Sequence, residues 1–157
     1  MNIRRYIPYI VCIGFAFLAG AIGSFFTFQN IPLWYNHLVH PFWTPPNWVF
    51  GPAWSLLYIL MGISAALVWK SQTKGKVLAL SIFFFHLIVN SAWSIIFFGL
   101  QDPLTALLVI KSLWLLIVAL MIVNWRYSRT ATLLLIPYLL WVTYAASLNL
   151  GIILLNP

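Results

Sequence analysis

Five long apolar runs make up most of this sequence, and each is long enough to cross the hydrocarbon core of a bilayer. Crossing a core of about 30 Å takes roughly 20 helical residues. Lipid offers the backbone no hydrogen-bonding partner, so a continuous apolar segment that crosses it must form a helix. The sequence therefore predicts an all-α fold: an integral membrane bundle of five transmembrane helices in a single domain, residues 1–157. The helices are expected at residues 6–28, 48–69, 77–100, 104–125 and 131–155, with a folded loop at residues 29–47.

The composition excludes several classes of function. Charged residues make up 6% of the chain, against roughly 25% in a soluble domain, and the basic ones lie almost entirely in the gaps between the apolar runs. The net charge of +7 is therefore a topology signal, and no nucleic-acid partner is expected. The single acid, Asp102, excludes mechanisms that need two carboxylates. The single cysteine, Cys12, excludes an intrachain disulfide. His37 and His40 in the loop, with His86 as a third candidate ligand, have no Cys or carboxylate nearby, so no metal site is expected.

The basic residues predict an orientation. With five crossings, three of the connecting or terminal segments share one side of the membrane, and seven of the eight basic residues lie in them. For a cell membrane reached through the usual insertion machinery, the positive-inside rule then places the N-terminus in the cytoplasm, and residues 29–47 and the C-terminus outside. These seven residues are Arg4, Arg5, Lys70, Lys74, Lys76, Arg126 and Arg129.

The segment 29–47 is unusual for an extramembrane loop because it combines aromatic residues with closely spaced prolines. Prolines at this density disfavour a regular helix and stiffen the chain. One interpretation is an aromatic belt at the level of the lipid headgroups, where Trp and Tyr are enriched. The other is a folded lid over a cavity between the helices, which accounts better for the prolines. The segment contains Trp34, Tyr35, Phe42 and Trp43 among Pro32, Pro41, Pro45 and Pro46.

Three of the expected helices carry a face that combines aromatic and polar residues, because residues three or four apart share one face. Polar groups within a membrane span usually face the bundle interior. They could serve as hydrogen-bonding contacts between helices, or line an apolar cavity with a few polar groups, as in a small-molecule site. Flat aromatic walls suit a flat ligand such as a tetrapyrrole or sterol. The faces are Phe50, Trp54, Tyr58, Met61 and Ala65; Phe83, His86, Asn90, Trp93 and Phe97; and Tyr138, Trp141, Ala145 and Asn149.

A series of short motifs in the chain resembles the translocator protein family (TspO/MBR), which is also called the peripheral-type benzodiazepine receptor family and, in bacteria, the tryptophan-rich sensory proteins. The resemblance runs from the first to the fifth apolar run. It rests on Trp34-Tyr35, Pro41-x-Trp43-x-Pro45-Pro46, Phe50-Gly51-Pro52-Ala53-Trp54 with Tyr58, Asn90-x-x-Trp93, Phe97-Phe98-Gly99, Pro137-Tyr138-x-x-Trp141 and Leu148-Asn149.

The resemblance implies a membrane-embedded binding protein, acting as a sensor, carrier or regulator for tetrapyrroles such as protoporphyrin IX or haem. It also implies binding of sterols and benzodiazepine-type ligands, and a homodimer. No cofactor is required, and the porphyrin or haem would be the ligand. An enzyme that degrades porphyrin with light or oxygen is one alternative, with Trp54 and Trp141 as candidates, and a transporter is another. By motif position, the ligand-binding residues are Tyr35, Pro45, Trp54, Asn90, Trp93, Trp141 and Ala145, with Phe50, Tyr58 and Tyr138 nearby.

Three further features bear on these expectations. Animal members of the family carry a cholesterol-recognition pattern that needs a Lys or Arg after a Tyr, and no basic residue follows Tyr144, which argues against sterol binding of the animal type. Lys111 lies within the fourth run, where it either extends toward the headgroups or binds an acidic side chain of a porphyrin. The small residues Ala16, Gly20 and Ser24 share one face of the first run and indicate close packing, within the bundle or between two copies.

Overall fold

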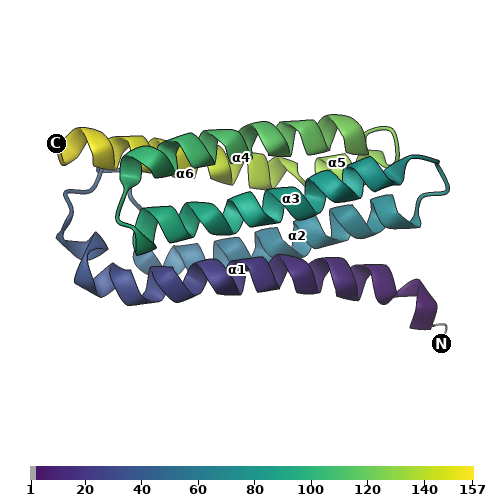
Figure 1. Cartoon of the computed structure of the whole chain (residues 1–157), viewed down its shortest axis with the longest axis horizontal. Coiled ribbons are helices and arrows are strands. Elements are labelled where there is room, and N and C mark those ends of the chain that lie inside the picture. Colours follow the sequence, from purple (N-terminus) through teal and green to yellow (C-terminus); the bar gives the residue numbers. More distant parts are fainter. Residues whose placement is uncertain (1–2) are drawn as a thin grey trace.

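In the computed structural model, which describes residues 3–157, the chain forms a bundle of helices that lie side by side along one long axis (Figure 1). Five helical segments are long and apolar enough to span a membrane, and no strand occurs in the described range. The expected all-α bundle with five transmembrane helices is therefore confirmed. The helices are α1 (Ile7–Leu33), α2 (Phe50–Lys70), α3 (Lys76–Ser94), α4 (Pro103–Asn124), α5 (Arg129–Leu133) and α6 (Ile136–Leu155), and α3 continues into the π-helical η4 (Ile95–Gly99).

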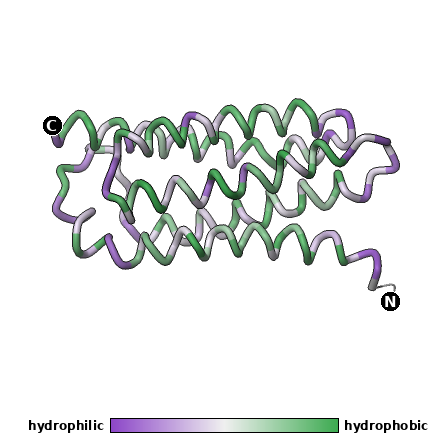
Figure 2. The backbone as a smooth tube through the Cα atoms, in the orientation of Figure 1, coloured by the Kyte–Doolittle hydropathy of each residue, from purple (hydrophilic) through white to green (hydrophobic). Residues whose placement is uncertain are grey.

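Polar groups mark the helix ends, and the hydrophilic residues gather at the two ends of the bundle (Figure 2). Asp102 caps α4, because its Oδ1 accepts a hydrogen bond from the Thr105 N–H at 3.0 Å and Pro103 takes the first helical position. The hydrogen bonds from Thr105 also hold the pKa of Asp102 below its ordinary value. At the other end of the bundle, Lys76 Nζ donates hydrogen bonds to the carbonyl oxygens of Trp69 and Ser71, at 2.6 and 3.0 Å, and so caps the C-terminus of α2.

Two boundaries differ from those expected. Residues 29–33, expected in the loop, belong to α1, and the connection to α2 contains only the short 3-10 helices η2 (Tyr35–His37) and η3 (Asn47–Val49). Pro32 is tolerated because it lies one residue before the end of α1 and withholds only one backbone donor there. The fifth run is not one helix. It divides into α5 and α6 just before Pro137, which offers no N–H to the Leu133 carbonyl.

Glycine allows α1 and α2 to approach closely. Gly62 of α2 lies against the backbone of Ile13, where a Cβ would overlap the Ile13 N and Cα atoms. On α1, Ala16 is fully buried, and a Cβ at Gly20 would overlap the ring of Tyr58. The face of small residues on α1 therefore packs inside the bundle, as one of the two interpretations expected.

Replacing Gly62 with Ala should lower the free energy of unfolding by about 1–3 kcal/mol, the usual cost of overpacking, because α1 and α2 would have to separate. The matched control is Gly14→Ala on α1, since a Cβ at Gly14 meets nothing within 4 Å. This second change should stabilise the protein by roughly 0.5–1 kcal/mol by removing the conformational entropy of glycine in a helix. Thermal unfolding of both variants in detergent measures the difference, and equal midpoints would refute the close approach of the two helices.

Candidate ligand cavity

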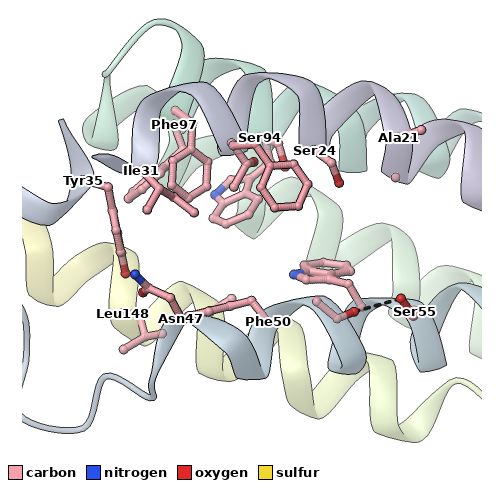
Figure 3. A pocket seen from close by; sticks show the side chains of 18 of the residues that line it. Ala21, Ser24, Ile31, Tyr35, Asn47, Phe50, Ser55, Ser94, Phe97 and Leu148 are labelled. Atoms are coloured by element: carbon pink, nitrogen blue, oxygen red, sulfur yellow. Dashed lines mark hydrogen bonds between the residues drawn. The ribbon is translucent and has the colours of Figure 1, made fainter. Parts of the chain in front are cut away.

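A cavity of about 490 Å³ lies in the half of the bundle that contains the loop between α1 and α2. Its volume falls within the range of small-molecule sites, roughly 300–1,000 Å³. Figure 3 shows Ala21, Ser24 and Ile31 on one side of it and Asn47, Phe50 and Ser55 across from them. The walls come from α1, α2, the end of α3 with η4, and α6, and Tyr35 closes the end nearest the loop.

Six of the ten predicted ligand-binding residues line this cavity. They share an aromatic or small side chain, and two aromatic pairs present stacked rings. Trp54 and Tyr58 of α2 have ring centroids 5.6 Å apart, and Trp93 stacks on Phe97 of η4 at 5.5 Å. The six residues are Tyr35, Phe50, Trp54, Tyr58, Trp93 and Ala145.

Asn90 and Tyr138 lie behind the wall and do not line the cavity. The hydroxyl of Tyr58 donates to Asn90 Oδ1 at 3.4 Å, and Asn90 Nδ2 donates to the Tyr138 hydroxyl at 3.0 Å. Tyr138 is fully buried and its ring contacts Trp54 edge to face, with centroids 6.2 Å apart. The two residues therefore hold Tyr58 and Trp54 in position from α3 and α6.

Trp141 and Pro45 also lie outside the cavity. The Trp141 ring packs edge to face on Phe50 with centroids 6.0 Å apart, so it supports a lining residue. Pro45 borders a separate hollow within the loop, together with His40 and Thr44. Of the two tryptophans considered for an enzymatic role, only Trp54 reaches the cavity.

The sequence did not predict that α1 forms one wall of the cavity. The small residues Gly20, Ala21 and Ser24 leave space in front of α2, and Thr27, Phe28 and Ile31 continue the wall toward the loop. The face of small residues was the available signal, since small side chains indicate close packing and equally leave room for a ligand. The further lining residues are Phe17, Asn47, Trp48, Gly51, Ser55, Ser94, Phe97, Phe98, Leu148, Asn149 and Ile152.

The aromatic residues of the loop fall into two groups: some pack inward, as expected of a lid over the cavity, and others are exposed, as expected of an aromatic belt. Trp34 and Tyr35 pack inward on Phe97, with ring centroids 5.6 and 6.2 Å apart. Burial raises the pKa of Tyr35 to about 12, so it remains a neutral phenol at physiological pH. In contrast, Phe42 exposes 96% of its surface and Trp43 exposes 41%. One part of the loop therefore covers the cavity, and its outer aromatic residues are free to lie among lipid headgroups.

The loop is fastened to the C-terminal end of α6. Asn156 pairs with the backbone of Val39, because its Oδ1 accepts from the Val39 N–H at 2.9 Å and its Nδ2 donates to the Val39 carbonyl at 3.0 Å. The Tyr144 hydroxyl donates to the Trp43 carbonyl at 2.7 Å. Gly151 leaves the space that Pro41 fills. These contacts hold the loop over the end of the bundle.

The cavity is electrically neutral. No Lys, Arg, His, Asp or Glu is among its lining residues. Asn149 accepts from Trp93 Nε1 at 3.3 Å and donates to the Pro103 carbonyl at 2.8 Å, so its amide is already partnered. Lys111 lies on the exposed side of α4, outside this wall.

Metal-ligating side chains are scattered. Residues 3–157 contain no group of three His, Cys, Asp or Glu side chains that could hold a metal ion. His37 and His40 lie in the loop, whereas His86 is fully buried in α3 and directs its Nδ1 at the Phe83 carbonyl. Cys12 is buried in α1. The neutral and largely aromatic lining of the cavity suits noncovalent contact with an apolar molecule.

Residues 12–155 match the TspO/MBR family. The chain is 42% identical over 156 residues to the tryptophan-rich protein TspO of Archaeoglobus fulgidus, with 99% of each chain covered. It is 39% identical to the tryptophan-rich sensory protein of Cereibacter sphaeroides, covering 78% of this chain and 77% of that one. With the human translocator protein it shares 34% identity, covering 90% and 88% of the two chains.

Replacing Asn156 with Ala should loosen the loop, because the Val39 backbone loses both side-chain partners. Two hydrogen bonds of about 1 kcal/mol each correspond to amide exchange roughly ten- to thirtyfold faster around Val39. Hydrogen exchange followed by mass spectrometry measures this rate in the detergent-solubilised protein. The control is Asn36→Ala, since Asn36 is exposed in the same loop and accepts only a long bond of 3.4 Å from Asn47. An unchanged exchange rate in the Asn156 variant would refute the fastening.

Proposed function

The chain belongs to the TspO/MBR family, and from this premise we propose that it binds a tetrapyrrole such as protoporphyrin IX or haem in the cavity and acts as a membrane-embedded sensor, carrier or regulator. The observation that carries the proposal is a neutral cavity within the bundle, walled by stacked aromatic residues and covered by a fastened loop. Aromatic rings favour stacked or edge-to-face contact with another flat π system.

The shape of the wall supports a flat ligand. Phe97 and Phe50 lie on opposite sides of the cavity (Figure 3). Each belongs to an aromatic cluster, Phe97 with Trp93 and Phe50 with Trp141. A macrocycle between these sides would bury both of its faces against aromatic carbon, which favours binding through removal of apolar surface from water and lipid headgroups.

The neutrality of the cavity supports a particular direction of binding. Burying a carboxylate without a partner is costly, so the two propionates of a protoporphyrin should remain at the polar end of the site. Tyr35 and Asn47 border both the cavity and the loop hollow, and Figure 3 shows them next to each other. His40 and Thr44 add polar atoms to that hollow. We place the propionates there and the unsubstituted edge of the macrocycle deeper between α1 and α2.

The basic residues support the orientation with the N-terminus in the cytoplasm. The N-terminus, the turn between α2 and α3, and the turn between α4 and α5 lie at one end of the bundle, whereas the loop and the C-terminus lie at the other (Figure 1). Lys74 belongs to the first end, and all seven basic residues of the connecting segments gather there. In a bacterial cell membrane the ligand cavity would then open near the outer surface.

A membrane-impermeant amine reagent applied to intact cells should leave Lys74 unmodified, while a tag at Pro157 should be reached from outside. The reason is the bias of basic residues toward the cytoplasmic side. Permeabilised cells provide the control, because both positions should then react. Modification of Lys74 in intact cells together with protection of the tag would reverse the orientation.

Replacing Trp54 with Ala should weaken binding of protoporphyrin IX by about 1–3 kcal/mol, if its indole stacks on the macrocycle as aromatic residues stack on nucleobases. Trp125→Ala is the matched control, because Trp125 is exposed and contacts Arg129 at the far end of the bundle. Fluorescence titration of each purified variant gives the affinity, and a thermal melt confirms that each remains folded. Equal losses in both variants would contradict a site at Trp54.

The same titration with the dimethyl ester of protoporphyrin IX tests the placement of the propionates. In a neutral site the ester should bind within a few-fold of the diacid, because no cation of the cavity pairs with the carboxylates. An affinity for the ester a hundredfold lower than for the diacid would show that a cation recognises the carboxylates, and would overturn this part of the proposal. Failure of both compounds to bind would overturn the proposed function itself.

A further inference from the structure

We propose that Lys111, on the lipid-facing side of α4, binds the phosphate of an anionic phospholipid. The other seven Lys and Arg residues lie at the end of the bundle that carries the N-terminus, and Lys111 does not. It is exposed and does not border the ligand cavity. The site is therefore separate from the proposed porphyrin site and does not depend on it.

The depth of Lys111 makes it unusual. It follows Pro103, the first residue of α4, by eight positions, which is about 12 Å along a helix. Half of a bilayer core measures about 15 Å, so with Pro103 at the edge of the core the Cα of Lys111 would lie close to the middle of the membrane. A cation at this depth is costly unless it finds a partner or reaches the headgroups.

The surroundings of Lys111 on its own helix are apolar. Leu104, Leu108 and Leu115 share its face and expose 66%, 62% and 63% of their surfaces. Lys111 is exposed, and within residues 3–157 no acidic side chain lies next to it on α4. The single acid, Asp102, is held at the start of α4 by its bond to Thr105, about 13 Å away along the axis. The partner of Lys111 must therefore come from outside the chain.

The direction of the side chain favours a lipid headgroup as that partner. Helical side chains lean toward the N-terminus of their helix, and for α4 this is the end that carries the loop. The amine would extend along the surface of α4 toward the nearer headgroup layer, and a phosphate would move inward to meet it. Free phosphate ions do not enter hydrocarbon, so the lipid is the source that can supply the group at this depth.

The neighbouring surface can hold the acyl chains of that lipid. Trp114 lies one turn deeper than Lys111 and is 36% exposed. Its Nε1 donates to Thr143 Oγ1 of α6 at 2.9 Å, so the indole bridges α4 and α6. This ring and Leu115 form a fixed apolar surface below the amine. A phospholipid with its phosphate at Lys111 would lay its chains on that surface.

The test compares lipid retention by native mass spectrometry after exchange into equal amounts of phosphatidylglycerol and phosphatidylcholine. The natural protein should retain phosphatidylglycerol, and Lys111→Met, which keeps the length of the side chain, should lose one tightly held copy with at least a tenfold drop in its occupancy. Lys111→Arg should retain it. Lys74→Met is the control, because it removes an exposed cation at the other end of the bundle.

Several outcomes would overturn the proposal. Equal retention by the natural protein and Lys111→Met would remove Lys111 from lipid binding, and equal losses in Lys111→Met and Lys74→Met would show a nonspecific charge effect. Displacement of the lipid by inorganic phosphate would indicate a water-exposed anion site. A change in oligomeric mass of Lys111→Met, with lipid retention unchanged, would assign Lys111 to a contact between copies of the chain. Thermal melts exclude misfolding of the Met variant, since a folded protein should melt at an unchanged midpoint without lipid.

Discussion

Hydrocarbon supplies no hydrogen-bonding partner, and the contacts between helices in this bundle follow from that constraint. The buried Ser, Thr and Asn side chains of the bundle each bond to another helix. Asn90 links Tyr58 of α2 to Tyr138 of α6. Asn149 links Trp93 of α3 to the first residue of α4. A few neutral polar groups therefore determine which helix faces meet, while the apolar surface supplies contact without direction.

The same constraint shapes the cavity. Polar groups are costly in a space within the membrane, so its wall consists mainly of aromatic rings, small residues and aliphatic side chains. Gly20 makes room for the ring of Tyr58, and Asn90 fixes the hydroxyl of that ring from behind. The lining residues are held by a second layer of side chains that never touches the cavity. Asn90, Tyr138 and Trp141 belong to that layer, which is why a family motif can contain them without their lining the site.

The number of helices and the aromatic character of the site were predictable from the sequence, because length and hydropathy decide whether a segment spans a bilayer. The role of α1 was not, since Gly20 and Ser24 fit a tight contact and an open space equally well. The boundary at residue 28 was misplaced because Gln29 and Asn30 are polar, yet Asn30 Nδ2 bonds within the helix to the Phe26 carbonyl. Which loop aromatics turn inward depends on Phe97 and Asn156, which are far away in sequence.

The charged residues of this protein lie at its surface, and the cavity is neutral. The cavity contains no charged residue, so the proposed binding there would depend on the shape of the ligand, on stacking and on where its polar groups emerge. Charge acts only at the surface, where seven basic residues mark one end of the bundle and Asp102 caps a helix at the other. A neutral cavity costs little to desolvate when a flat apolar ligand enters it. A charged cavity would require an opposite charge in every ligand. Because the cavity of this chain is neutral, the anion binding that we propose lies on the outer surface of the helices, at Lys111.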